Sequence, residues 1–166
     1  MTTYTGRTVG KFCKFQIESS SGAMATIPVN SFGQIGLTYD EIDVTALQEA
    51  IKSMLNGQGS FSTTISGPFD NDAIVTAETS GLAPALSGSH TVLSALNGGT
   101  VAKSFGFYIG VQQYWLAGDP VFGAIDSVLV SQYTTDGQTY TARISTAGNR
   151  LNDPAWGTSS IVASST

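Results

Sequence analysis

The sequence predicts one mainly β domain, a β-sandwich or partly open barrel with a single flanking α-helix. Three observations lead to this class. Several segments alternate apolar and polar residues, turn signals recur at short spacing, and only one long stretch has helical periodicity. A chain of 166 residues is long enough to bury its own core. We therefore assign residues 1–166 to one domain, with 1–10 and 157–166 as extended terminal arms.

The strands are predicted from their alternation and composition. Lys11–Glu18 and Phe105–Val111 place apolar residues on one face and polar or small residues on the other, as half-buried strands do. Ala25–Val29 fits a short strand, and Ser60–Ser66 is rich in the Thr, Phe and Ile that strands favour. The glycine-containing segment Asn30–Leu37 is predicted to be a loop.

The flanking helix is predicted over Asp43–Asn56, where apolar residues recur at steps of three and four. Asp43 or Thr45 can cap its first turn, and Gly57 can provide a left-handed exit. On this interpretation Ile51→Asp would unfold the domain, because it places a charge in the buried stripe. The stripe consists of Val44, Leu47, Ile51, Met54 and Leu55.

The second half of the chain contains the clearest hairpin signal. Ser127–Thr134 and Gln138–Ile144 flank the pair Asp136-Gly137, which suits a type I′ turn with positive φ at both central residues. We therefore expect these two segments to pair as antiparallel strands.

The middle of the chain is less patterned, because small residues and glycines dominate Asn71–Gly99. A strand near Ala73–Ala77 and a short helix near His90–Leu96 both fit the residues there.

Composition limits the class of function. Only 11% of the residues are charged, the net charge is −5, and the seven basic residues are scattered. Clustered cations are needed to bind nucleic acid tightly, so this activity is not expected. A polar surface with few charges favours contact with other protein surfaces. We expect no membrane anchor, since no apolar run approaches the ~18 residues of a membrane span, and Cys13, the only cysteine, can form no disulfide within the chain.

Motifs for catalysis are missing from the sequence. His90 is the only histidine, and no nucleophile-elbow or phosphate-loop pattern is present. Asp70-Asn71-Asp72 begins like a calcium loop but lacks its glycine and closing glutamate. Trp115 and Trp156 could stack on a sugar, although such residues are more often core or interface anchors. We expect neither an enzyme nor a metal or cofactor site.

Two parts of the chain resemble major tail tube proteins of long-tailed, siphovirus-like phages. The first is Tyr39–Asn71, YDEIDVTALQEAIKSMLNGQGSFSTTISGPFDN. In that family an acidic start of the form DVT-L leads into a short helix, a glycine-rich turn and a strand ending in a PFD-like sequence. The second part is marked by Phe105, Tyr114-Trp115, Gly118-Asp119-Pro120-Val121-Phe122, Asp136-Gly137 and Pro154-Ala155-Trp156-Gly157-Thr158.

This resemblance implies two roughly orthogonal sheets and a structural role in the virion tail. Hexameric rings of the protein would assemble in the host cytoplasm and stack into a hollow tube through which phage DNA passes as non-specific cargo. The other partners would be the tape-measure protein and tail-tip or terminator proteins. The residues expected to face the lumen are Asp70 and Asp72. The residues expected between rings are Thr3, Tyr4, Phe32 and Gln34.

Other functions remain open at this point. A capsid decoration protein would be a virion β-protein that binds a shell rather than forming tubes. A carbohydrate-binding β-sandwich module would use Trp115 or Trp156. An enzyme of unrecognised type is the least favoured alternative.

Overall fold

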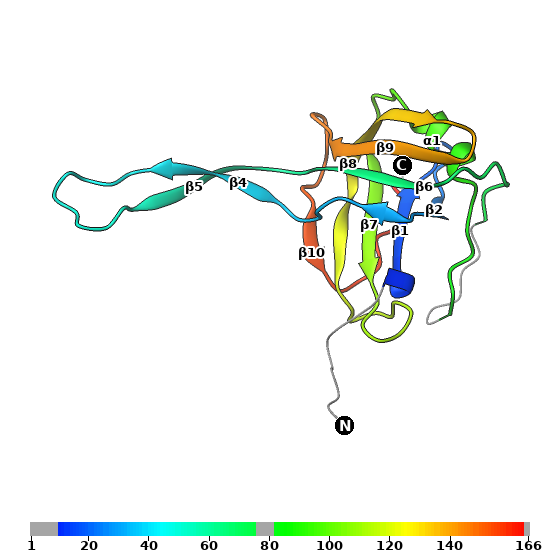
Figure 1. The fold of residues 1–166 in the computed structure, drawn as a ribbon, viewed down its shortest axis with the longest axis horizontal. Coiled ribbons are helices and arrows are strands. Elements are labelled where there is room, and N and C mark those ends of the chain that lie inside the picture. The colour runs from blue at the N-terminus through cyan, green and yellow to red at the C-terminus, as the bar shows by residue number, and fades with distance from the viewer. Residues whose placement is uncertain (1–9, 76–81, 165–166) are drawn as a thin grey trace.

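The computed structural model describes residues 10–75 and 82–164 and shows a mainly β sandwich from which a long hairpin projects (Figure 1). An eight-stranded antiparallel sheet forms the sandwich, which we call the body, in the order β2-β1-β7-β8-β9-β6-β3, with β10 paired to β8. Its strands are β1 (Cys13–Glu18), β2 (Met24–Ile27), β3 (Ser31–Phe32), β6 (Ser62–Pro68), β7 (Lys103–Ile109), β8 (Val121–Thr135), β9 (Thr139–Thr146) and β10 (Ala155–Gly157). A short 3-10 helix, Gly10–Phe12, precedes β1.

The long strand β8 belongs to both layers of the sandwich. Its first part pairs with β7 and its second part with β9. The register shifts along β8, and Asp126 and Gln132 adopt positive φ values of 50° and 56° within it. Such bulges bend a strand and increase its twist. As a result β6 and β9 cross over β1 and β7, so the two crossing layers are halves of one strongly bent sheet (Figure 1).

The core between the layers is built around phenylalanine rings. Phe107 lies 4.6 Å from Phe15, measured between ring centroids, and Phe61 lies 4.9 Å from Phe122. Each ring is fully or almost fully buried, which stabilises the fold by about 1.5–3 kcal/mol per large side chain. The aliphatic part of the same core includes Ile17, Ile27, Ile65, Val92, Leu93, Val128 and Ile144.

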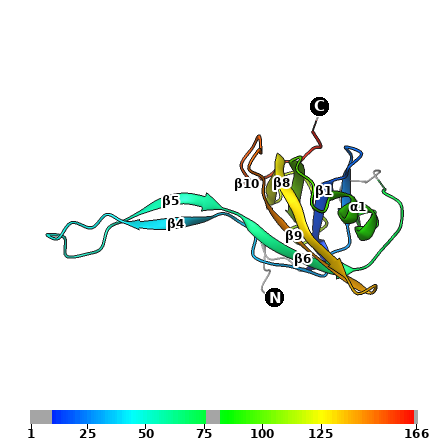
Figure 2. The ribbon, with the colours of Figure 1, turned by 90° about the horizontal axis from the view of Figure 1, so that it is seen from above.

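The projecting hairpin, which we call the arm, corrects the main helix prediction. Asp43–Asn56 forms no helix: β4 (Thr38–Asp43) and β5 (Met54–Ser60) pair as a separate two-stranded sheet that extends away from the body (Figures 1 and 2). Gly57, expected as the helix exit, lies within β5. The predicted stripe is exposed at every position: Val44, Leu47, Ile51, Met54 and Leu55.

The physical reason is that, among the described residues, no body surface covers the segment between the two arm strands or the apolar stripe predicted there. A helix of this length is marginal in water unless its apolar face is buried by packing. The hairpin instead satisfies the backbone groups across two strands, and its far end is closed by the Thr45 hydroxyl, which donates to the Ser53 carbonyl at 3.2 Å and accepts from the Ser53 N–H at 2.7 Å. The apolar periodicity was therefore not a sign of intramolecular burial.

The single α-helix of the described residues is α1 (Ser89–Leu96), which confirms the short helix expected near His90–Leu96. It buries Val92 and Leu93 in the main core. The strand expected near Ala73–Ala77 is wrong for Ala73–Val75, where the Val75 backbone bonds the Ser87 hydroxyl instead of a strand; its last two residues lie outside the described residues.

The predicted hairpin of the second half is confirmed as β8 and β9, but its turn differs from the prediction. Only Gly137 has positive φ, at 90°, whereas Asp136 does not. The Asp136 carboxylate instead accepts the backbone N–H groups of Gln138 and Thr139, both at 2.9 Å. The aspartate thus acts through its side chain rather than through a left-handed backbone.

Candidate assembly surface

The arm carries the two most exposed large apolar side chains of the described residues. Leu47 and Ile51 lie between its two strands, at its far end, and are 101% and 82% exposed. Other large apolar residues of the arm are about half exposed: Tyr39, Ile42, Val44, Met54 and Leu55. Exposed apolar side chains gathered on one element are typical of sites that contact another protein.

The arm is also acidic. Residues 38–60 contain four acids and one base, so their net charge is 1 − 4 = −3. Lys52, the one base, is exposed at the tip beside Ile51. The tip therefore combines one cation, Lys52, with the apolar residues Leu47 and Ile51 and one acid, Glu49, whose carboxylate accepts the Ser53 hydroxyl at 2.6 Å.

The predicted lumen residues lie beside α1. The Asp70 carboxylate accepts the Asp72 N–H at 2.9 Å, and the Asp70 carbonyl accepts the N–H of His90 at 2.9 Å. The Asp72 carbonyl accepts the Thr91 hydroxyl at 2.7 Å. Through these bonds the two residues hold the first turn of the helix, and their placement in a lumen stays a prediction.

The predicted inter-ring residues are not brought together. Phe32 is half-buried and packs against the core, with its ring centroid 5.3 Å from that of Phe107. Gln34 is exposed. Thr3 and Tyr4 lie outside the described residues, and the contact role of all four stays a prediction.

The two tryptophans have different surroundings. Trp115 is buried against Tyr108, with ring centroids 4.8 Å apart, and its Nε1–H donates to the carbonyls of Asp119 and Pro120. A ring buried in this way has no face left for a sugar. Trp156 is 52% exposed on β10, with its ring 5.2 Å from Phe122.

His90 contacts a tyrosine hydroxyl, and Cys13 is partly buried. The His90 Nδ1 lies 2.9 Å from the Tyr133 hydroxyl. Cys13 is half-buried, and burial raises the pKa of its thiol above the usual value. Within residues 10–75 and 82–164 no three His, Cys, Asp or Glu side chains gather as metal ligands. In the same ranges no helix has the length and apolar character to cross a bilayer.

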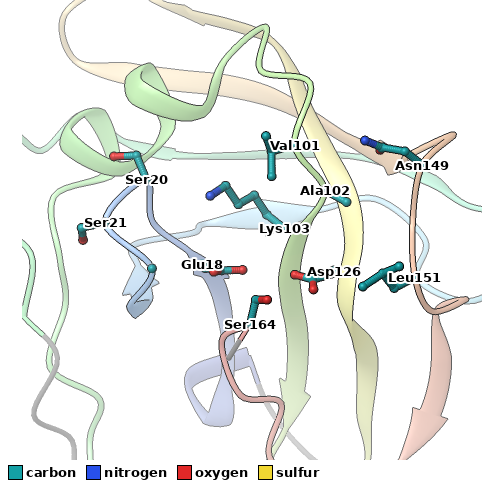
Figure 3. A pocket seen from close by; sticks show the side chains of 11 residues that line it. Glu18, Ser20, Ser21, Val101, Ala102, Lys103, Asp126, Asn149, Leu151 and Ser164 are labelled. Atoms are coloured by element: carbon teal, nitrogen blue, oxygen red, sulfur yellow. The ribbon is translucent and has the colours of Figure 1, made fainter. Parts of the chain in front are cut away.

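A cavity of about 470 Å³ opens where β1, β7 and β8 meet, and Figure 3 shows its lining. Glu18 and Asp126 are only 4% and 9% exposed and lie on either side of Ser104. The Ser104 N–H donates to Glu18 Oε2 at 3.1 Å, and the Ser104 hydroxyl accepts the Asp126 N–H at 3.1 Å. Val101 and Leu151, both largely exposed, contribute apolar walls.

Comparison with solved structures finds a chain of similar fold. A chain in the structure of the anti-feeding prophage cap, described as the AFP tube terminating cap, has a TM-score of 0.50 and 8% identity over 96% of each chain. A chain in the structure of an extracellular contractile injection system, the PVC sheath/tube terminator in its extended state, has a TM-score of 0.44 and 10% identity over 87% of this chain and 93% of that chain. No family model matches the sequence, and no curated protein matches it.

Proposed function

We propose that this protein is a structural component of a phage-tail-like particle and that its copies form stacked hexameric rings of a hollow tail tube. The observation that carries the proposal is the arm, which exposes apolar side chains that its own body does not cover. The fold likeness to a chain of a tube-terminating cap structure supports a tail role. Two independent features, one geometric and one comparative, thus favour the same class of protein.

The arm suits assembly because of its reach and its surface. It extends well beyond the body, so it can contact another copy while the two bodies remain apart (Figure 2). Specific interfaces bury about 1,200–2,000 Å² in total. A hairpin with apolar residues along both strands can supply a large part of that area, and covering it removes those side chains from water.

The remaining partners follow from the same proposal. Neighbouring copies would be the main contacts, together with the tape-measure protein and tail-tip or terminator proteins in the virion tail. Phage DNA would pass without being held, which the net charge of −5 supports because an acidic wall repels phosphates. We keep Asp70 and Asp72 as proposed lumen residues on this basis.

A terminator is the second candidate, since the similar chain belongs to the structure of a tube-terminating cap. A terminator would close into one ring at the end of a tube made of another protein. The two candidates differ in whether rings of this chain stack on one another.

Negative-stain electron microscopy and light scattering of the concentrated wild-type protein test the proposal. Hollow tubes of constant width support the tube subunit, and rings that do not stack support the terminator. A chain that stays monomeric, alone and with preformed tubes, contradicts both. Monomers that instead bind empty capsids would identify a decoration protein.

A matched pair of variants isolates the arm. Leu47→Ser with Ile51→Ser removes the exposed tip residues and should abolish tubes or rings while the fold remains. Val162→Ser, which changes an apolar residue that is also exposed but lies off the arm, should assemble like the wild type.

A further inference from the structure

The cavity between β1, β7 and β8 contains two buried acids whose charge is not balanced by an ion pair within the described residues. Asp126 is 9% exposed, and its carboxylate has no hydrogen-bond or ion-pair partner there, while Glu18 is bonded through Oε2 to the Ser104 N–H alone. In Figure 3 the two carboxylates point toward each other in the cavity. Burial of an unpaired carboxylate is costly, so a cationic group placed here would stabilise the site.

Lys103 lines the same cavity but leaves the acids unpaired. Its side chain is directed toward Ser20, away from both carboxylates (Figure 3). Two acids and one base give the lining a net charge of 1 − 2 = −1. One additional cation would make the lining neutral.

The shape of the cavity indicates an organic cation rather than a metal ion. Its volume of about 470 Å³ is far larger than one ion needs, and Val101 and Leu151 stand exposed at its walls. A lysine side chain matches this arrangement, because its aliphatic stem packs on apolar surface while its ammonium reaches the carboxylates.

We propose that the arm tip of one copy docks in this cavity of another copy, with the Lys52 ammonium between Glu18 and Asp126. Lys52 is exposed and is flanked by Ile51 and, nearby on the tip, Leu47, which would cover Val101 and Leu151 at the cavity walls. The same chain thus carries both halves of the contact, a cation with apolar neighbours and an acidic cavity with apolar walls. The arm holds its tip far from its own body, so the contact forms only between copies (Figure 1). This inference rests on the proposed self-assembly and names its contact.

Two single variants test the contact, one for the arm tip and one for the cavity. Lys52→Gln removes the cation, and Asp126→Asn removes one buried charge with little change of shape. Each should raise the concentration needed for assembly by about tenfold or more, because loss of one partner leaves the other buried and unpaired. Lys52→Arg should assemble near wild-type concentration. Lys11→Gln, an exposed lysine off the arm, is the matched control.

Mixing the two variants gives a sharper result. Asp126→Asn retains an intact arm, and Lys52→Gln retains an intact cavity, so a mixture contains one complete contact that neither variant has alone. Sedimentation should show dimers of the two variants in the mixture and monomers in each variant alone at the same concentration. Carbodiimide cross-linking with one variant ¹⁵N-labelled should join Lys52 of the Asp126→Asn chain to Glu18 or Asp126 of the Lys52→Gln chain.

The outcomes separate this inference from the proposed function. Wild-type tubes or rings together with unchanged assembly of Lys52→Gln overturn the docking contact and leave the assembly proposal standing. A wild-type chain that never associates overturns both. Circular dichroism of Asp126→Asn checks that its fold is retained. If Asp126→Asn does not fold, Lys52→Gln and Lys52→Arg decide the result alone, since Lys52 is exposed and off the body.

Discussion

The body and the arm are built from similar residues but place them in opposite environments. In the body, β7 buries Phe105 and Phe107 completely, and its neighbours on both sides satisfy its backbone. In the arm, β4 and β5 have no other strand partner among the described residues than each other, and their apolar residues are about half exposed or more. The body therefore folds on its own contacts, whereas the arm leaves its apolar side chains exposed.

The difference shows that an apolar pattern in a sequence does not reveal whether those residues are covered by the same chain. Truncating a side chain of the body should lower the free energy of unfolding more than truncating a side chain of the arm. Substitutions in both regions, ordered by their expected effect on stability, test this difference.

The largest loss of stability is expected for Phe107→Ala. Phe107 is fully buried, and its ring contacts Phe15, Phe32, Phe61 and Phe105. Truncation of such a ring leaves a cavity and should lower the free energy of unfolding by about 3–5 kcal/mol, measured by urea denaturation. A loss below about 1 kcal/mol would show that this part of the core is loosely packed.

A smaller loss is expected for Tyr140→Phe. The buried Tyr140 hydroxyl donates to the Pro28 carbonyl at 2.7 Å, which ties β9 to the segment after β2. Removal of the donor leaves the carbonyl unpaired and should cost about 1–3 kcal/mol in the same urea experiment. An unchanged midpoint would mean that water replaces the hydroxyl.

The same tyrosine predicts a dependence on alkaline pH. Burial, and then the charge of Tyr133, raises the pKa of Tyr140 above its usual value. The folded state therefore favours the protonated phenol, and its contribution is complete below the unfolded pKa of about 10 and is lost as the pH rises above it. Thermal unfolding between pH 8 and pH 11 should show a steeper loss of Tm for the wild type than for Tyr140→Phe. Parallel curves would contradict this role.

A slight effect is expected at the Asp136 turn. Hydrogen bonds from the backbone N–H groups of Thr139 and Gln138 lower the pKa of Asp136. Its contribution is present above the unfolded pKa of about 4 and is lost as the pH falls through the lowered value. Asp136→Ala should lower the Tm slightly at pH 7, and the difference from the wild type should shrink toward pH 2. A constant difference across this range would point to a cause other than the carboxylate.

The smallest effect on folding is expected for Ile51→Asp. The sequence alone predicts that this substitution unfolds the domain, but Ile51 is exposed at the arm tip. The free energy of unfolding should change by no more than about 0.5 kcal/mol, as for other exposed positions. Circular dichroism with urea denaturation measures it, and a loss of several kcal/mol would restore the buried-helix interpretation.

Sequence reasoning predicted most strands of the body because these carry their own signals, but it missed the two-residue strand β3 (Ser31–Phe32) inside the predicted loop Asn30–Leu37. The alternation of Phe15 and Ile17 with Lys14 and Gln16 predicts β1, since one face of that strand is buried within the same chain. The Asp136-Gly137 pair likewise located the β8–β9 hairpin. In both cases local chemistry and the final environment agree.

The arm and the cavity lie beyond what local patterns can predict. Val44, Leu47 and Ile51 fit a helical stripe, but no body surface covers them among the described residues, and the hairpin pairs β4 with β5 instead. Glu18 and Asp126 are far apart in sequence. They line the same cavity because their strands, β1 and β8, pair with opposite edges of β7. The unusual positive φ of Asp126 has no sequence signal that we recognise.

The direct continuation of the arm into the body has a mechanical consequence. β5 ends at Ser60 and β6 begins at Ser62, and the two strands run in nearly the same direction (Figures 1 and 2). β6 is paired with β9 along its whole length, from Ser62–Ser145 to Pro68–Thr139. Tension applied to the arm therefore pulls β6 lengthwise, and its cross-strand hydrogen bonds share the load instead of opening one after another. A particle held together by such arms would resist stretching through the backbone of each subunit.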